Sequence, residues 1–378
     1  MIPLSVPNLS GNEWQYIKDC LDTNWVSSVG SYVTKFEQVT ADYTGAKYAI
    51  ATSNGTSAIH IALLLAGVKA NDLVIAPNIT FVASINAIKY IGANPILIDI
   101  DANTWQMDID LLEEFLVNNT IIEDEACIYK KTKQVIRAIL PVHVLGNMGD
   151  MDKLISLANI YRLKIVEDST EALGSYYKGK HAGTFGQLGT LSYNGNKLIT
   201  TGGGGMILTD DELIAKKAKH LTTQAKSKTD EYFHDEIGYN FRLVNILAAM
   251  GVAQMEQLPK FLNRKLEIVN FYNAKLLSIE GFTNQKILED VKPNFWLHTV
   301  KIPRAKELLA YFKELGVEAR PFWIPMNQLP ANADDLYYTK TDISNNVYQN
   351  CVSLPCSTGV SDNELETVVK IIQSFYEN

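Results

Sequence analysis

Short apolar runs alternate with helix-like segments between about residues 45 and 210. The apolar runs occupy residues 73–76, 95–100, 138–142 and 163–168, and the helical segments occupy 56–66, 81–91, 110–117 and 152–161. Uninterrupted apolar runs of this length are typical of strands buried on both faces of a largely parallel sheet. The alternation therefore predicts an α/β fold with helices on both faces of that sheet. A ligand is expected beyond the carboxyl ends of the strands.

The pattern changes after about residue 243. Residues 243–278 have helical periodicity interrupted at Pro259, and the rest mixes short strands (295–302, 317–320) with helices (305–315, 362–376). This change predicts a large α/β domain over residues 1–250 and a smaller C-terminal α+β domain over residues 251–378. The first 30 residues are expected to pack against one or both domains.

Composition narrows the class of protein. The chain has 378 residues, of which 47% are hydrophobic and 20% charged, as in an ordinary soluble protein. Its 34 basic and 42 acidic residues give a net charge of −8, which argues against a general nucleic-acid-binding surface. No apolar run approaches the roughly 18 residues of a membrane span, and the start lacks the pattern of a signal peptide. The cysteines are few and form no CxxC pair, so the sequence predicts a reducing, cytoplasmic environment (Cys20, Cys127, Cys351, Cys356).

Several common catalytic signatures are missing from the sequence. It contains no P-loop, no HExxH, no zinc-type cysteine and histidine spacing and no GxSxG elbow. A metal is therefore not expected.

A run of small polar residues opens one of the predicted helices. Asn54-Gly55-Thr56-Ser57-Ala58 precedes the apolar stretch 59–64. Backbone N–H groups, the positive end of the helix dipole and hydroxyl groups converge at such a terminus, so it suits a phosphate. An ordinary helix N-cap is the alternative.

Two further positions carry groups suited to catalysis. Asp168 ends an apolar run, where it would serve as a metal ligand, a general base or the partner of a cationic ring nitrogen; capping the next turn is the alternative. Lys197 ends the small, polar segment 189–197, just before the glycine-rich stretch 200–205. A desolvated lysine there would be a nucleophile, whereas an exposed lysine in a flexible loop would have no such role.

Taken together, these three features match the needs of pyridoxal phosphate. Its phosphate requires an anion pocket, its ring nitrogen an acid, and its aldehyde a lysine. Phe81 is a candidate for stacking on the ring, although a core aromatic at the start of a helix would look the same.

The sequence resembles the DegT/DnrJ/EryC1/StrS family of sugar-nucleotide aminotransferases over nearly its whole length. The matching segments are IPLSVPNLSGNEW, NWVSSVGSYVTKFE, SNGTSAIHIAL, PNITFVASINAI, PVHVLG, VEDSTEALGS, LSYNGNKLITTGGGGM and GYNFRLVNILAAMG. The resemblance implies a fold-type I pyridoxal-phosphate enzyme. It also implies a homodimer with shared active sites.

The resemblance assigns roles position by position. Lys197 corresponds to the lysine that forms the Schiff base with the cofactor and moves the proton, and Asp168 to the partner of the pyridine nitrogen. Glu171 stands beside the ring hydroxyl, where most of the family has Gln. The remaining cofactor contacts implied are with the phosphate (Gly55, Thr56, Ser57, Ser192), with the ring (Phe81), from the neighbouring subunit (Asn240), and from Asn194 in the lysine segment.

The substrate is inferred from two departures from the family pattern, namely Asn-Gly-Asn-Lys in place of Pro-x-Lys, and Glu171. They resemble most the subgroup that aminates C4 of UDP-4-keto-6-deoxy-N-acetylhexosamines for surface glycans, with L-glutamate as the usual donor. Candidate substrate contacts are Trp25, Ser28, His143, His298 and Arg320.

Other readings of the sequence stay open. The acceptor is alternatively GDP-4-keto-6-deoxymannose or a TDP-linked 3-keto sugar, and a non-catalytic, cofactor-binding relative is a further alternative. A related sugar dehydratase would carry His in place of the lysine, so Lys197 argues against that activity.

Overall fold

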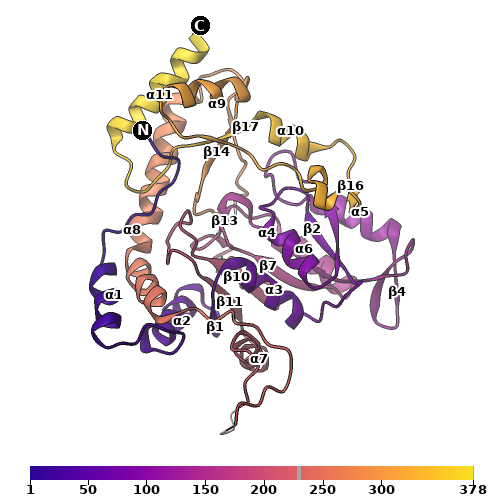
Figure 1. Ribbon diagram of the computed structural model, residues 1–378. Coiled ribbons are helices and arrows are strands. Elements are labelled where there is room, and N and C mark those ends of the chain that lie inside the picture. The colour runs from indigo at the N-terminus through magenta and orange to yellow at the C-terminus, as the bar shows by residue number, and fades with distance from the viewer. Residues whose placement is uncertain (228–230, 378) are drawn as a thin grey trace.

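The computed structural model describes residues 1–227 and 231–377. A large mixed sheet lies at its centre (Figure 1), with its strands in the spatial order β1-β11-β10-β7-β6-β2-β3-β16. Neighbours from β10 across β7 to β16 pair in parallel, whereas β11 pairs antiparallel with both β1 and β10. The strands run over Tyr48–Thr52 (β1), Gly205–Thr209 (β11), Leu188–Ser192 (β10), Lys164–Asp168 (β7), Val135–Ile139 (β6), Leu73–Pro77 (β2), Asn94–Ile98 (β3) and Leu336–Tyr338 (β16).

Four of these strands, β2, β3, β6 and β7, overlap the apolar runs predicted from the sequence, and their parallel pairing is confirmed. β6 begins three residues before its predicted run. A hairpin of β4 (Thr120–Glu123) and β5 (Ala126–Tyr129) pairs with β6. β16 comes from the C-terminal third of the chain and extends the large sheet beyond β3.

Helices cover both faces of the sheet, as the alternating pattern predicts (Figure 1). One face packs against α3 (Gly55–Leu65), α4 (Ala83–Tyr90) and α7 (Glu212–Thr222). The other face packs against α5 (Ile109–Asn119) and α6 (Met151–Ile160) over β2, β3 and β6, and against α2 (Ser31–Thr44) and α8 over β1, β10 and β11. Successive residues of one strand enter opposite cores, because side chains alternate along a strand: Val74 lies in the first core and Ile75 in the second.

The long helix α8 (Asn245–Leu276) corrects the expectation of an interruption at Pro259, since the helix runs through that residue. Proline removes one backbone donor and crowds the preceding turn, which usually kinks or ends a helix. Here Leu258 and Phe261 beside it are fully buried in the core, and their packing holds the helical path. α1 (Glu13–Asp22) packs along the same helix.

A second, antiparallel sheet belongs to the C-terminal part of the chain. Its order is β12 (Thr283–Asn284), β14 (His298–Lys301), β17 (Cys351–Leu354) and β15 (Arg320–Pro321). The end of α8, α9 (Ala305–Glu314) and α11 (Asp362–Glu377) share its core. The chain's start is tied to this part, because Ile2 bridges to Val317 and the N–H of Cys356 donates to the carbonyl of Leu4. Further elements include α10 (Ile343–Asn350) and a small sheet of β13 (Val291–Lys292), β8 (Tyr176–Tyr177) and β9 (Lys180–His181).

Asp99 anchors the C-terminal segment to the end of β3. Its buried carboxylate accepts hydrogen bonds from the N–H groups of Ile343 (2.8 Å) and Ser344 (2.9 Å), from the Ser344 hydroxyl (2.5 Å) and from the Thr339 hydroxyl (2.6 Å). Burial opposes ionisation, but these hydrogen bonds outweigh it and hold the pKa of Asp99 below its ordinary value of 3.8. The carboxylate therefore stabilises the fold above that pH, and this contribution is lost as the pH falls through the lower, folded-state value.

We expect Asp99→Asn to lower the free energy of unfolding at neutral pH by about 1–3 kcal/mol, because buried donors lose their acceptor. The wild type should lose part of this difference in acid, so the two stabilities converge as the pH falls. Urea denaturation at neutral and acidic pH measures both effects. Asp334→Asn, at an exposed position near the same segment, is the control. Equal stability of Asp99→Asn and the wild type at neutral pH would contradict the assignment.

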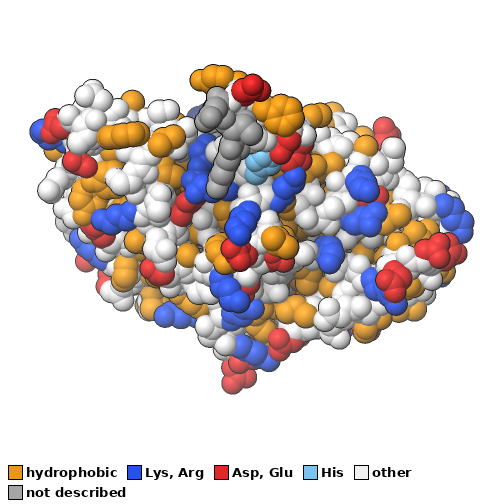
Figure 2. Space-filling view, turned by 90° about the horizontal axis from the view of Figure 1, so that it is seen from below, with side chains coloured by type: hydrophobic (Ala, Val, Ile, Leu, Met, Phe, Trp, Pro, Cys, Tyr) orange, Lys and Arg blue, Asp and Glu red, His pale blue; other side chains and the backbone are white. Residues whose placement is uncertain are grey.

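Among the described residues, no helix is both long and apolar enough to cross a membrane. The four cysteines are free thiols and all are buried. Figure 2 shows the face that carries α7, where basic and acidic side chains are interspersed.

Candidate active site

A cavity of about 560 Å³ opens just beyond the carboxyl ends of β7 and β10. Its floor comes from the large sheet and includes Glu171 and Lys197, and its opposite wall comes from the C-terminal third and includes Trp296 and Arg320. The cavity therefore lies where the expectation for an α/β sheet placed it, at the strand ends.

Lys197 lies on this floor with its amine largely shielded from solvent. Its side chain is 12% exposed, and Nζ lies 3.9 Å from Oε1 of Glu171. The indole ring of Trp296 covers the amine, with its centre 4.2 Å from Nζ. Burial lowers the pKa of Lys197, against the opposing pull of Glu171 and Asp168. A larger share of the amine is thus neutral and nucleophilic than in a solvated lysine.

Glu171 is the acidic neighbour of that amine. Its Oε2 accepts a hydrogen bond of 2.8 Å from the N–H of Leu145. Burial raises the pKa of Glu171 to about 7, with Lys197 and the Leu145 N–H lowering it and Asp168 raising it. Leu145 adopts a left-handed backbone conformation (φ 62°), which is unusual for a branched residue.

Asp168 ends β7 beneath the cavity. Its Oδ2 accepts a 2.6 Å hydrogen bond from the hydroxyl of Ser84, and its Oδ1 accepts one of 3.1 Å from the N–H of Thr170. The side chain is buried and is not part of the cavity's immediate lining. Two neutral donors thus fix a carboxylate just behind the floor, where its charge acts on both Glu171 and Lys197.

The start of α3 forms a close cradle on the other side of the floor. The side chain of Asn54 caps the helix by accepting from the N–H of Ser57 (2.8 Å), and Gly55 and Thr56 line the cavity. A Cβ on Gly55 would lie 2.9 Å from Cβ of Ser192, so a larger residue would close this space. Such a helix terminus, with hydroxyl groups beside it, fits a phosphate group.

The other predicted cofactor residues divide into two groups. Phe81, Ser192 and Asn194 line the cavity, and Phe81 is 54% exposed, so its ring is available to stack on a planar ligand. Ser57 lies just behind the lining, where its hydroxyl accepts from that of Ser53 (3.3 Å). Asn240 is exposed outside the cavity and forms a backbone bridge with Thr223.

The two candidate histidines do not reach the cavity. Nε2 of His143 lies 2.9 Å from Oε2 of Glu167, whose carboxylate also accepts from the backbone N–H groups of residues 183, 185 and 186. His298 is buried in the C-terminal core, where it stacks on Tyr272. Burial and the nearby Lys265 lower the pKa of His298 to about 3, so it is neutral at physiological pH.

Of the other substrate candidates, one reaches the cavity. Arg320 lines its rim, with an exposed side chain. Trp25 is 56% exposed and Ser28 half-buried, and both lie in the loop before α2, outside the cavity lining.

Asn294 and Trp296, from the C-terminal third of the chain, form hydrogen bonds with the floor of the cavity and were not predicted from the sequence. The indole N–H of Trp296 donates to the carbonyl of Asn196 (2.7 Å), beside Lys197. The amide of Asn294 donates to the carbonyl of Glu171 (2.8 Å) and accepts from the N–H of Trp296 (2.8 Å). The sequence contained one signal for this wall of the cavity, namely the adjacent aromatic residues at 295–296 and at 322–323. In the structure Trp296 and Trp323, one from each pair, stack with ring centres 6.3 Å apart.

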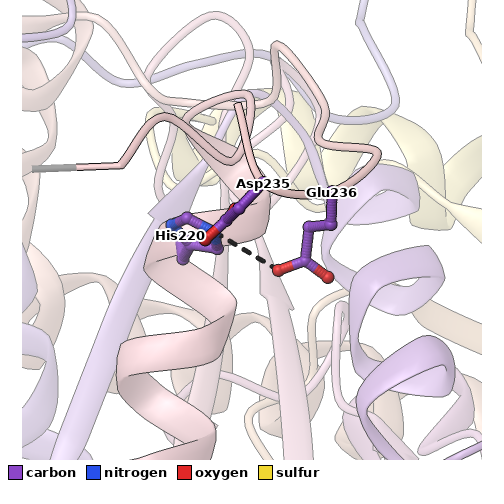
Figure 3. Close-up of side chains that lie close together, drawn as sticks. All are labelled: His220, Asp235 and Glu236. Atoms are coloured by element: carbon purple, nitrogen blue, oxygen red, sulfur yellow. Dashed lines mark hydrogen bonds and ion pairs between the residues drawn. The ribbon is translucent and has the colours of Figure 1, made fainter. Parts of the chain in front are cut away.

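A separate group of polar residues lies at the end of α7, away from the cavity (Figure 3). Nε2 of His220 lies 2.7 Å from Oδ1 of Asp235 and 3.2 Å from Oε1 of Glu236. These are residue types that bind metals, but Lys217 already pairs with the same Glu236 oxygen. The arrangement is that of a surface ion-pair network.

Comparisons with known proteins point to one family. The model of the DegT/DnrJ/EryC1/StrS aminotransferase family matches residues 7–373. The GDP-perosamine synthase of Escherichia coli O157:H7 is 37% identical over 380 residues, which covers 100% of this chain and 99% of that protein. The GDP-perosamine synthase of Caulobacter vibrioides is 35% identical over 378 residues, covering 97% and 96%.

A solved structure shares the whole fold. The putative sugar aminotransferase Spr1654 from Streptococcus pneumoniae, in its PLP form, superimposes with a TM-score of 0.89 at 24% identity, covering 100% of this chain and 98% of that one. The expected fold, a large domain with a mostly parallel central sheet and a smaller C-terminal α+β part, is confirmed.

Proposed function

The chain belongs to the DegT/DnrJ/EryC1/StrS aminotransferase family, and we propose that it transfers an amino group from L-glutamate to C4 of GDP-4-keto-6-deoxymannose. It is a sugar aminotransferase that uses pyridoxal phosphate, as the sequence predicted. The observation that carries the choice of sugar is the full-length similarity to two GDP-perosamine synthases. Perosamine is a 4-amino-4,6-dideoxymannose, so its formation by amino transfer requires that keto sugar.

The nucleotide proposed here differs from the one that the sequence alone favoured. The departures at Glu171 and in the segment 194–197 favoured a UDP-linked N-acetylhexosamine, with the GDP-linked sugar as an alternative. The curated relatives support the alternative. The acceptor is a nucleotide sugar in either case, and the amine is destined for a polysaccharide.

The cavity supports the proposal through its fit to the cofactor. The cradle at Gly55, Thr56 and Ser192 suits the phosphate, because a Cβ at residue 55 would fill it. The exposed ring of Phe81 suits a planar ring, and the fixed carboxylate of Asp168 suits a cationic nitrogen. When bound, pyridoxal phosphate supplies a carbonyl that captures amines and a ring that withdraws electrons from the adjacent carbon.

The protein's own residues then have separable tasks. Lys197 binds the cofactor carbonyl through Nζ and afterwards holds and moves the proton at that atom. Asp168 stabilises a positive charge through its two hydrogen-bonded oxygens, and Trp296 covers Lys197 so that water is excluded from the amine. Arg320, on the rim, is placed to bind an anionic group of the donor or of the nucleotide.

Further parts of the proposal concern assembly and location. We propose a homodimer in which exposed Asn240 reaches the partner's cofactor phosphate, a cytoplasmic location, and a division into domains near residue 250. His143 and His298 are assigned structural roles, because each is buried outside the cavity. Trp25 and Ser28 lie outside the cavity lining and stay untested candidates for contact with the substrate.

The proposed acceptor predicts a clear order of substrates. Purified protein, loaded with pyridoxal phosphate and supplied with L-glutamate, should convert GDP-4-keto-6-deoxymannose with a kcat/KM roughly 10–200-fold above that for the matching UDP-linked N-acetyl sugar, a range typical of pocket selectivity. Mass spectrometry of the sugar nucleotide identifies the amine. A preference for the UDP sugar would restore the sequence-based choice, and 2-oxoglutarate formation with no sugar accepted would reject both.

A further inference from the structure

Glu171 and Lys197 form an ionisable pair at the floor of the cavity. The exposed fractions of their side chains are 2% and 12%, and Oε1 lies 3.9 Å from Nζ. Among the described residues, Lys197 and Asp168 are the charged groups that act on Glu171, and the N–H of Leu145 is its hydrogen-bond donor. Glu318 and Arg320 line the same cavity from the C-terminal side.

The two carboxylate oxygens of Glu171 have different surroundings. Oε2 is held by the N–H of Leu145, while in the described part of the chain Oε1 has Lys197 as its polar neighbour. The backbone of Glu171 is also fixed, since its carbonyl accepts from the amide of Asn294. The side chain therefore presents one oxygen to the amine from a rigid support.

The neighbouring carboxylates are engaged elsewhere. Both oxygens of Asp168 accept hydrogen bonds, from Ser84 and Thr170, and those of Glu167 accept from His143 and from three backbone N–H groups. Of the buried acids near the floor, Glu171 is thus the one with an oxygen directed at Lys197.

We propose that Glu171 is the proton-exchange partner of Lys197: its carboxylate takes the proton from the ammonium when Lys197 must act as a free amine, and returns it when Lys197 must act as an acid. The N–H bond of the ammonium breaks as the O–H bond of the carboxylic acid forms, so the pair keeps its total charge. This inference rests on the proposed function, because amino transfer needs the same amine both with and without its proton.

The burial of the two groups makes such an exchange favourable. Burying two opposite charges away from water costs free energy, and moving one proton from the ammonium to the carboxylate neutralises both groups at once. An amine and a carboxylic acid that interact this closely titrate as a pair, in two linked steps. The proton stays beside the amine in this exchange and is not released to solvent.

The test measures the ionisation of Lys197 without requiring catalysis. Full-length protein freed of cofactor is labelled with limiting acetic anhydride across the neutral and alkaline range, and acetylation of Lys197 is measured by peptide mass spectrometry. The wild type should show two linked steps. Glu171→Gln keeps the size and an acceptor for the Leu145 N–H but removes the charge. It should give a single step whose midpoint lies about 1–3 pH units lower, because the ammonium loses its opposite charge.

Two further variants separate proton exchange from a structural role. Glu171→Asp keeps the carboxylate and should retain both steps, whereas Glu318→Gln removes a charge from the same cavity and should leave the profile unchanged. A profile of Glu171→Gln that superimposes on the wild type would overturn the inference. Failure of amino transfer to the sugar would reject the proposed function but would leave the labelling result intact, so the two failures are distinguishable.

Discussion

Replacing Lys197 with alanine is expected to abolish amino transfer while leaving the fold intact. The variant loses the nucleophile and the acid–base group together, and the acid–base contribution alone is worth about 10²–10⁴-fold in rate. The fold should persist, because the buried amine makes one long ion pair and a contact with the Trp296 ring, and burial already disfavours its charge. Steady-state assay with L-glutamate and the keto sugar, together with circular dichroism and thermal unfolding, measures both expectations.

Lys178→Ala is the matched control for this substitution. Lys178 is a half-exposed lysine that pairs with Asp152 at the surface, outside the cavity lining. Its replacement should leave turnover unchanged. Normal turnover by Lys197→Ala would remove this lysine from the mechanism, and with it the assignment of the cavity as the active site.

Asp168→Asn is expected to have the second-largest effect. The amide preserves the size of the side chain and an oxygen for the N–H of Thr170, but it removes the negative charge behind the floor. Loss of a preorganised electrostatic partner typically costs roughly 10²–10³-fold in kcat. We expect a loss of that order with the cofactor still bound, since the phosphate cradle at Gly55 and Thr56 is untouched.

A second variant grades this effect. Ser84→Ala removes the 2.6 Å hydrogen bond to Oδ2 of Asp168 while keeping the charge, so its loss of kcat should be much smaller. Stopped assays at saturating substrate and the visible absorption of bound cofactor separate turnover from binding. Wild-type kcat in Asp168→Asn would show that this carboxylate does not assist the chemistry.

The parts of the site found from the sequence are those that a short segment defines. Asp168 ends an apolar run, and Gly55 and Thr56 open an apolar helix, so strand and helix periodicity place them at the sheet edge. Lys197 was recognisable because an unusual glycine-rich stretch follows it. Each pattern alone left an ordinary structural role open, and the roles were assigned from the three features together and from the family resemblance.

Contacts between distant segments were not predictable in the same way. Trp296 donates to the carbonyl of Asn196, 100 residues earlier in the chain, and no periodicity connects the two segments. The strand β16 joins the large sheet from the C-terminal third, held by the hydrogen bonds of Asp99. His143 follows a strand, a common position for a catalytic residue, but its Nε2 pairs with Oε2 of Glu167 and neither residue lines the cavity.

The helix through Pro259 shows how contacts between distant segments can also override a local sequence signal. A local rule, that proline ends helices, was overruled by the burial of Leu258 and Phe261 in the core. The strands β1, β10 and β11 were likewise absent from the expectation; β11 pairs antiparallel with the other two, which come from segments far apart in the chain.

The indole ring of Trp296, which lies over Lys197, also makes the state of that amine observable by tryptophan fluorescence. Its fluorescence is emitted 4.2 Å from the reacting amine, so any change of charge or covalent state at that nitrogen acts directly on the emitting ring. The other four tryptophans add background. Phenylalanine substitutions at the exposed Trp14 and Trp25 would lower it, while Trp105 and Trp323, which stacks on Trp296, would still contribute. Binding of donor and acceptor can then be timed by light from the protein itself, with no label attached.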